Sequence, residues 1–422
     1  MNTDYEVMWN DLGLDIDKHN FLLDFLGNAY KDVFLNQAYR PKGMEYLDFV
    51  VSEAHGLRIK ELVDAKKDGR KVIGVFCLYV PEEIIVALNG ICVGLCGGAD
   101  FEPESVQARL GSRNICPLIQ SFMGFKLGKV CPFFEVADIL VGETTCDGKK
   151  KVYESLNDIQ NTYTVCMPPR CDDAGKVYFK GELLKLVAKL EEITGNKLTA
   201  ENLAKGIEKV NTKRKALERL YSLRKQRNVP LSGLDTLLIS QIAFYEDIDR
   251  FIAKINELCD ELESTREGIK GSEHMKRIMV TGTPMAFPNW KIHHLVESTG
   301  NALVVCEEAC TGTRYFEKIF ASANDLEKDM EVILEHYSNI HCACFTPNEE
   351  RVEDILRLVE EYKVDGVIVN NLTFCTNYAV EHAKVEKTLK EKGVSVLKIE
   401  TDYSNSDAES LKIRVEAFIE MI

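Results

Sequence analysis

The sequence predicts an α/β protein with two doubly wound parallel-sheet domains and a helical segment between them. Short apolar stretches alternate with helical patterns in two separate blocks, which is typical of parallel sheets covered on both faces. The stretch between the blocks has no strand pattern and repeats its apolar residues at helical spacing. The length of 422 residues suits two or three domains, each with its own core.

The first domain is expected to cover residues 1–175, with N-terminal helices ahead of its sheet. Pro81 stands at the first turn of one expected helix, and Glu82 and Glu83 follow at the positive end of its dipole. Four short apolar strands are expected: Lys71–Leu78, Ile91–Leu95, Ala137–Val141 and Tyr163–Met167.

The helical segment is expected to cover residues 176–275. Leu183, Leu186 and Leu190 recur at helical spacing, and Ala204–Leu223 and Phe244–Leu262 continue the amphipathic pattern. Such a segment suits a bridge between the domains or a dimer surface, and the sequence does not decide between them.

The second domain is expected to cover residues 276–422. Its expected strands are Arg277–Thr281, Ala302–Cys306, Gly366–Val369 and Val394–Ile399, and its main helices are Glu349–Tyr362, Tyr378–Lys392 and Ala408–Ile422. Both domains then have the flavodoxin- or Rossmann-like arrangement, in which ligands bind beyond the carboxyl ends of the strands.

Composition excludes several function classes. The chain has 52 Lys and Arg against 67 Asp and Glu, a net charge of −15, which opposes binding to nucleic acid. No apolar stretch approaches the ~20 residues that a membrane span needs. The acidic N-terminus lacks the pattern of a signal peptide, so we expect a cytoplasmic protein.

Cysteine is the unusual component, with 14 residues. A cytoplasmic chain keeps its thiols reduced, so many cysteines indicate metal ligation or catalysis rather than disulfides. The alternative is that buried cysteine serves as a small apolar residue. We apply that interpretation to Cys92, Cys166 and Cys259, and we expect Cys131, which precedes a strand at the opposite edge of the sheet, to be structural.

Most of the other cysteines follow expected strands, at the edge where such sheets bind ligands. For this placement the apolar run of the first strand is taken to end at Phe76, and that of the strand from Ala302 at Val305. Cys116 stands just before an expected helix. The cysteines placed at this edge are Cys77, Cys96, Cys116, Cys146, Cys306, Cys310 and Cys375. If the two sheets face each other across a cleft, thiolates from both domains converge there.

The spacing bears on which metal such thiolates would hold. No Cys-x-x-Cys pair of the kind typical of zinc sites is present, and Cys342-x-Cys344 is tighter. Dispersed cysteines from different strands fit an iron–sulfur cluster better, although zinc and plain thiols stay open from spacing alone.

Other motifs are weak or missing. The sequence has no G-x-x-x-x-G-K-[ST] for ATP and no G-x-G-x-x-G after a strand for a dinucleotide. For His293 and His294 we expect a structural or surface role. Glu307, Glu308 and Arg314 are expected to be solvated loop charges, although they lie near the proposed cleft.

Five segments resemble the 2-hydroxyacyl-CoA dehydratase and benzoyl-CoA reductase family of cluster-bearing subunits. They cover both α/β blocks, and TTCDGKKK within the third is the most specific motif. The segments are FCLYVPEEIIVALNGICVGLCGG, NICPLIQSFMGF, CPFFEVADILVGETTCDGKKKVYE, CEEACTGTRYF and VDGVIVNNLTFCTNYAVE.

The resemblance implies a cubane held by three cysteines, which match Cys116, Cys146 and Cys375. The chain looks most similar to the double-cubane cluster proteins, which join two cubanes through a sulfide and need three further cysteines. The candidates for the second cubane are Cys77, Cys96, Cys310 and Cys342. We prefer Cys77, Cys310 and Cys342, because Cys77 ends a strand that is expected to be central.

Two functions follow from the resemblance. The first is an iron–sulfur reductase with a double-cubane (8Fe-9S) cluster, which reduces small molecules with electrons from a separate cluster-bearing ATPase. The second is one component of an (R)-2-hydroxyacyl-CoA dehydratase, with a single 4Fe-4S cluster. The resemblance also implies a homodimer. An electron-transfer or cluster-storage protein, or a protein with purely structural cysteines, are the remaining interpretations.

Overall fold

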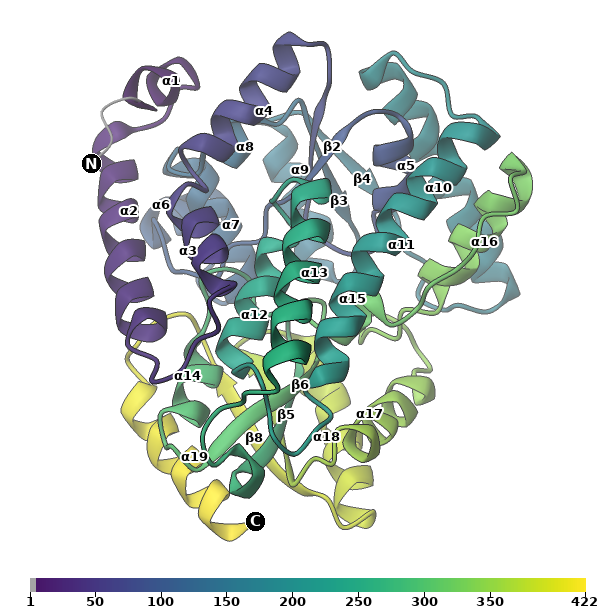
Figure 1. Cartoon of the computed structure of the whole chain (residues 1–422). Helices are drawn as coiled ribbons and strands as arrows, with labels where there is room; N and C mark the ends of the chain where they lie inside the picture. The colour runs from purple at the N-terminus through teal and green to yellow at the C-terminus, as the bar shows by residue number, and fades with distance from the viewer. Residues whose placement is uncertain (1–4) are drawn as a thin grey trace.

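The computed structural model describes residues 5–422, and it contains two four-stranded parallel sheets (Figure 1). Helices cover both sheets. The sheets have matching strand orders, β2-β1-β3-β4 and β6-β5-β7-β8. The predicted fold class, two doubly wound α/β units with helices between them, is therefore confirmed.

The first sheet consists of β1 (Val72–Val75), β2 (Ile91–Gly94), β3 (Ile139–Glu143) and β4 (Thr162–Val165). Its strands β1 and β3 are buried along their whole length, as expected for central strands covered on both faces. The helices of this half are α1 (Glu6–Asp11), α2 (Ile16–Tyr30), α3 (Met44–Ser52), α4 (Leu57–Lys67), α5 (Glu82–Ala87), α6 (Pro103–Leu110), α7 (Pro117–Leu127), α8 (Pro132–Val136) and α9 (Asp147–Asn157), with a π-helical turn η2 (Lys31–Leu35).

The second sheet consists of β5 (Lys276–Gly282), β6 (Ala302–Glu308), β7 (Gly366–Leu372) and β8 (Ser395–Thr401). The strands β6 and β7 are fully buried. The helices of this half are α14 (Lys291–Glu297), α15 (Thr313–Phe316), α16 (Leu326–Ser338), α17 (Glu349–Glu361), α18 (Thr376–Glu391) and α19 (Ala408–Met421).

The segment between the sheets is helical, as expected. It contains α10 (Asp173–Thr194), α11 (Ala200–Leu223), α12 (Gly233–Ile242), α13 (Ile248–Thr265) and a 3-10 turn η3 (Ser272–His274). Figure 1 places α11, α12 and α13 between the half with β2, β3 and β4 and the half with β5, β6 and β8. The predicted domain boundaries at residues 175 and 275 stay predictions.

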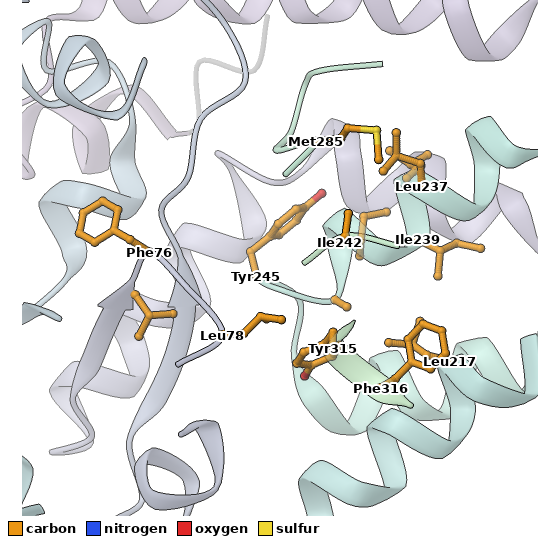
Figure 2. Packing of buried hydrophobic residues seen from close by; sticks show 14 of the residues in the cluster. Phe76, Leu78, Leu217, Leu237, Ile239, Ile242, Tyr245, Met285, Tyr315 and Phe316 are labelled. Atoms are coloured by element: carbon orange, nitrogen blue, oxygen red, sulfur yellow. The ribbon is translucent and has the colours of Figure 1, made fainter. Parts of the chain in front are cut away.

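A continuous apolar core joins the two halves to this helical segment. Figure 2 shows Phe76 and Leu78, just after β1, facing Tyr245 and the side chains of α12, with Tyr315 of α15 close by. Hydrogen bonds also cross between the halves: the Tyr79 hydroxyl donates to the carbonyl of Ile340 at 2.6 Å. Within residues 5–422, no helix is long and apolar enough to cross a membrane.

The strand β6 is longer than the sequence pattern indicates. It continues through Cys306, Glu307 and Glu308, which are all buried. The placement of Cys306 after the strand is therefore wrong, and so is the expectation that the two glutamates are solvated loop charges. The physical reason is pairing: Glu307 accepts from Arg224 at 3.0 Å, and Glu308 pairs with Arg314 and with Arg351.

Candidate metal centre

Cysteines stand at matching positions after strands in both halves. Cys77, Cys96 and Cys310 are each the second residue beyond the end of β1, β2 and β6. Cys146 and Cys375 are each the third residue beyond β3 and β7, which occupy the same place in their sheets. Since parallel strands share one carboxyl edge, this pattern gathers thiols where doubly wound sheets bind ligands.

Cys116, Cys146 and Cys375 are the N-cap residues of three helices, α7, α9 and α18. The free N–H groups and the dipole of a helix N-terminus stabilise a thiolate there. The backbone N–H of Lys149 donates to Sγ of Cys146 at 3.4 Å. We call these three residues the helix-cap group.

The members of the helix-cap group lie close together. A hydrogen bond between the Cys116 and Cys375 side chains lowers the pKa of Cys116 and raises the pKa of Cys375. Burial raises the pKa of Cys146, and the charge of Cys116 adds to that shift. The side chain of Asn377, in α18, donates to the carbonyl of Thr145 at 3.0 Å and so ties the two halves together beside the thiols.

Cys77, Cys310 and Cys342 form a second gathering, which we call the loop group because none of them caps a helix. The pKa of Cys310 is lowered by a hydrogen bond with Cys77, and the charge of Cys342 acts on it in the opposite direction. Sγ of Cys342 lies 3.5 Å from the hydroxyl of Tyr378. This group also draws sulfur from both halves of the chain.

Arg314 supplies positive charge to the loop group. Its side chain is only 5% exposed and contacts Glu308 and Tyr378, so the expectation of a solvated loop charge is wrong. Hydrogen bonds with neighbouring thiols and burial have the largest effects on the pKa of Cys342 and of Cys310. The charge of Arg314 is a smaller cause, and it lowers both pKa values. A buried guanidinium here favours the thiolate forms.

Cys344 is not among the sequence-based candidates, yet it lies beside the loop group. A hydrogen bond with Cys344 is the largest cause of the strongly lowered pKa of Cys342. Sγ of Cys344 also lies 3.7 Å from the hydroxyl of Tyr79. The signal in the sequence is the Cys342-x-Cys344 spacing, which places two thiols in one short loop.

Cys96 lies near thiols of both groups but makes a different contact. Its thiol donates a hydrogen bond to the carbonyl of Phe76 at 2.9 Å, which requires the protonated form. Burial raises the pKa of Cys96 to about 12. The raised pKa does not set Cys96 apart, because a hydrogen bond with Cys310 and burial also raise the pKa of Cys77. The carbonyl contact is what favours a thiol at Cys96.

Lys149 is a buried cation close to both groups, and sequence reasoning did not single it out. Its ammonium pairs with Glu143, which is fully buried at the end of β3. The charge of Lys149 acts to lower the pKa of five candidate thiols, although burial or a hydrogen bond has a larger effect on each of them. The five are Cys77, Cys96, Cys116, Cys146 and Cys310.

The remaining residues behave as structural groups. Cys259 is fully buried in α13, and Cys306 is fully buried in β6. Cys131 begins α8, which leads into β3, and it lines a small apolar cavity together with Cys96. His293 is buried, and its Nε2 lies 3.0 Å from a carboxylate oxygen of Glu307, in agreement with a structural role.

The set of thiol donors fits an iron–sulfur cluster, and a cavity adjoins two cysteines of the loop group. A cavity of about 130 Å³ is lined by Cys77, Cys96, Cys310, Lys149 and Arg314, with apolar side chains around them. No group of three or more His, Cys, Asp or Glu residues between positions 5 and 422 has the arrangement to hold one metal ion. In a cubane, however, each cysteine binds a different iron, so the thiols need not converge on one point.

A comparison with family models adds an independent observation. The model described as 2-hydroxyglutaryl-CoA dehydratase, D-component, matches residues 77–422, the part that carries every candidate cysteine. The chain belongs to this dehydratase family. Its match begins at Cys77 and includes both sheets from the end of β1 onward.

Several relatives are similar to this chain over most of their length. "Putative dehydratase subunit YjiM" of Escherichia coli (strain K12) is 34% identical over 88% of this chain and 96% of its own. The (R)-phenyllactyl-CoA dehydratase beta subunit of Clostridium sporogenes is 24% identical over 85% and 93%. A benzoyl-CoA reductase subunit of Thauera aromatica is 22% identical over 82% and 89%. The family therefore contains subunits of both dehydratases and a reductase.

Proposed function

We propose that this protein is an iron–sulfur reductase with a double-cubane cluster, which performs ATP-dependent reduction of small molecules. One observation carries the proposal: two adjacent groups of three partly or fully buried cysteines, each drawn from both halves of the chain. A single cubane on three cysteines would use only one of these groups.

In this proposal Cys116, Cys146 and Cys375 hold one cubane. Cys77, Cys310 and Cys342 hold the other, and Cys96 and Cys344 lie beside it as thiols. The hydrogen bond from Cys96 to the Phe76 carbonyl supports its place outside the ligand set. When bound, the clusters would supply electrons at low potential.

The chain's own residues set the environment of the sulfur ligands. The apolar side chains around Cys77 and Cys310 exclude water, which favours a low potential. Lys149 and Arg314 offset part of the negative charge that six thiolates would gather. Helix N-termini do the same for Cys116, Cys146 and Cys375.

The family resemblance implies that electrons would come from a separate ATPase that carries its own cluster. The lack of a P-loop motif for ATP in this sequence agrees with that division of labour. We also propose a homodimer in the cytoplasm, where thiols stay reduced. The relatives whose names mark them as subunits support the need for partner chains in general.

The second candidate is one component of an (R)-2-hydroxyacyl-CoA dehydratase, with one 4Fe-4S cluster on the helix-cap group. The names of several relatives favour it, among them the (R)-2-hydroxyglutaryl-CoA dehydratase beta subunit of Acidaminococcus fermentans, 23% identical over 86% of this chain and 95% of its own. In this case the loop-group thiols would carry no iron.

Iron and sulfide counted on anaerobically purified wild-type protein test the proposal. We expect about eight irons per chain, whereas about four would favour the dehydratase. The loaded protein is then assayed for ATP-dependent reduction of a small molecule with the activating ATPase. A cluster without ATP-dependent turnover would favour electron transfer or storage, and an iron-free protein would contradict every cluster-based function.

A further inference from the structure

Tyr403 has a buried hydroxyl with no hydrogen-bond partner in the described part of the chain. It lies in the loop after β8, and its ring is partly exposed although the oxygen is not. Buried hydroxyls nearly always have a partner, because they otherwise lose their hydrogen bonds to water without compensation. The oxygen is therefore available to donate to a group that the protein itself does not supply.

The surroundings of Tyr403 indicate what that partner is. Its ring packs with Cys96, Cys116 and Cys375 around a small apolar cluster of Leu118, Ala286 and Leu372. The phenol of tyrosine carries its proton at neutral pH and can donate a hydrogen bond. Two of these three cysteines belong to the helix-cap group.

Tyr403 also lines a cavity of about 360 Å³. This cavity is also lined by Pro117, Thr373 and Phe374, which are next to Cys116 or close to Cys375 in sequence. Tyr403 therefore borders both that cavity and the cluster that carries the cysteines, and its hydroxyl oxygen is buried.

We infer that the Tyr403 hydroxyl donates a hydrogen bond to a sulfur of the cluster on Cys116, Cys146 and Cys375. Tyr403 then acts as a positioning and tuning residue that raises the reduction potential of this cluster, because a hydrogen bond to sulfur stabilises the more negative, reduced form. The inference depends on the proposed cluster, but it applies equally to one cubane and to two.

The test uses anaerobic full-length protein and the substitution Tyr403→Phe, which removes one oxygen and keeps the ring. We expect unchanged iron and sulfide content and a more negative midpoint potential of the cluster. The potential is measured by a redox titration in which electron paramagnetic resonance detects the reduced cluster. The matched control is Tyr221→Phe, which removes a buried hydroxyl that lies 3.1 Å from Ser240 Oγ in the helical segment. That control should leave the potential unchanged.

An opposite change provides a second test if Tyr403→Phe does not fold. Incorporation of 3,5-difluorotyrosine at position 403 makes the hydroxyl a stronger donor, so the potential should shift to a less negative value. Unchanged potentials in a fully loaded variant would overturn the role of Tyr403 while leaving the proposed function intact. An iron-free wild-type protein would overturn both.

Discussion

The helix-cap group and the loop group differ in how the protein stabilises their charge. All three helix-cap thiols begin helices, and the backbone N–H of Lys149 donates to Sγ of Cys146. Backbone N–H groups also act to lower the pKa of Cys116 and Cys375, although a hydrogen bond between these two thiols has the largest effect on each. The loop group instead relies on side chains: Arg314, the hydroxyl of Tyr378 and the thiol of Cys344.

This difference has a consequence for substitution. Backbone donors remain when a neighbouring side chain is replaced, whereas side-chain donors are lost with the residue that carries them. We therefore expect iron retention by the loop group to depend strongly on the side chains around it. Iron retention by the helix-cap group, as distinct from its reduction potential, should depend mainly on its own cysteines, on the backbone and on Lys149, which acts on both groups.

The largest effect is expected from replacing the cysteines themselves. Cys310→Ser should remove about half of the iron, because one cubane of two loses a ligand. Cys375→Ser should remove at least as much. Iron and sulfide analysis of anaerobic protein measures both, with Cys166→Ser, directly after the edge strand β4, as the control. Full iron content in Cys310→Ser would contradict the assignment of the loop group.

A smaller effect is expected from Arg314→Met, which removes the cation beside the loop group. Loss of a residue that supports metal ligands typically weakens binding by roughly 10–100-fold. The rate at which a chelator removes iron should rise for half of the iron and stay unchanged for the rest. Arg357→Met, at an exposed site paired with Glu317 and Glu361, is the matched control. Equal loss from both groups would contradict the distinction between them.

Gly98→Ala should have a modest effect through the backbone. A Cβ at Gly98 would lie 2.1 Å from the carbonyl oxygen of Ala286, and the Gly98 N–H donates to Phe287 at 2.9 Å across the two halves. Overpacking of this kind costs roughly 1–3 kcal/mol. We expect a lower free energy of unfolding by denaturant, and slower iron loading of the helix-cap group.

The control for that substitution is Gly181→Ala in α10, where a Cβ has no neighbour within 4 Å. It should be neutral or slightly stabilising, because alanine favours a helix interior. If the two alanine variants unfold and load iron alike, the close contact at Gly98 does not hold the halves together.

Much of the fold and of the metal centre could be predicted from sequence, because both depend on local patterns. Short apolar runs mark the strands, and the residues directly after a strand lie at the carboxyl edge. This reasoning placed Cys77, Cys96, Cys146, Cys310 and Cys375 correctly beyond their strands. It did not separate Cys96 from the loop group, since its carbonyl partner is visible only in three dimensions.

The failures concern residues whose partners are distant in sequence. Glu307 and Glu308 read as a polar end to β6, but Arg224 and Arg351 neutralise them from α11's C-cap and from α17. In the sequence Lys149 is the first of three consecutive lysines. Only its buried ion pair with Glu143, seen in the structure, distinguishes it from the other two. Tyr403 carries no sequence signal, because its importance depends on loops from both halves.

The helix-cap group takes two thiols from the first half of the chain and one from the second. An inorganic core bound there would act as a crosslink between segments as far apart as Cys146 and Cys375, and it would restrict the unfolded chain as any long-range crosslink does. Insertion of iron and sulfide would therefore be linked to the closing of the two halves. Supply of the cofactor in the cell would then also control how much folded protein accumulates.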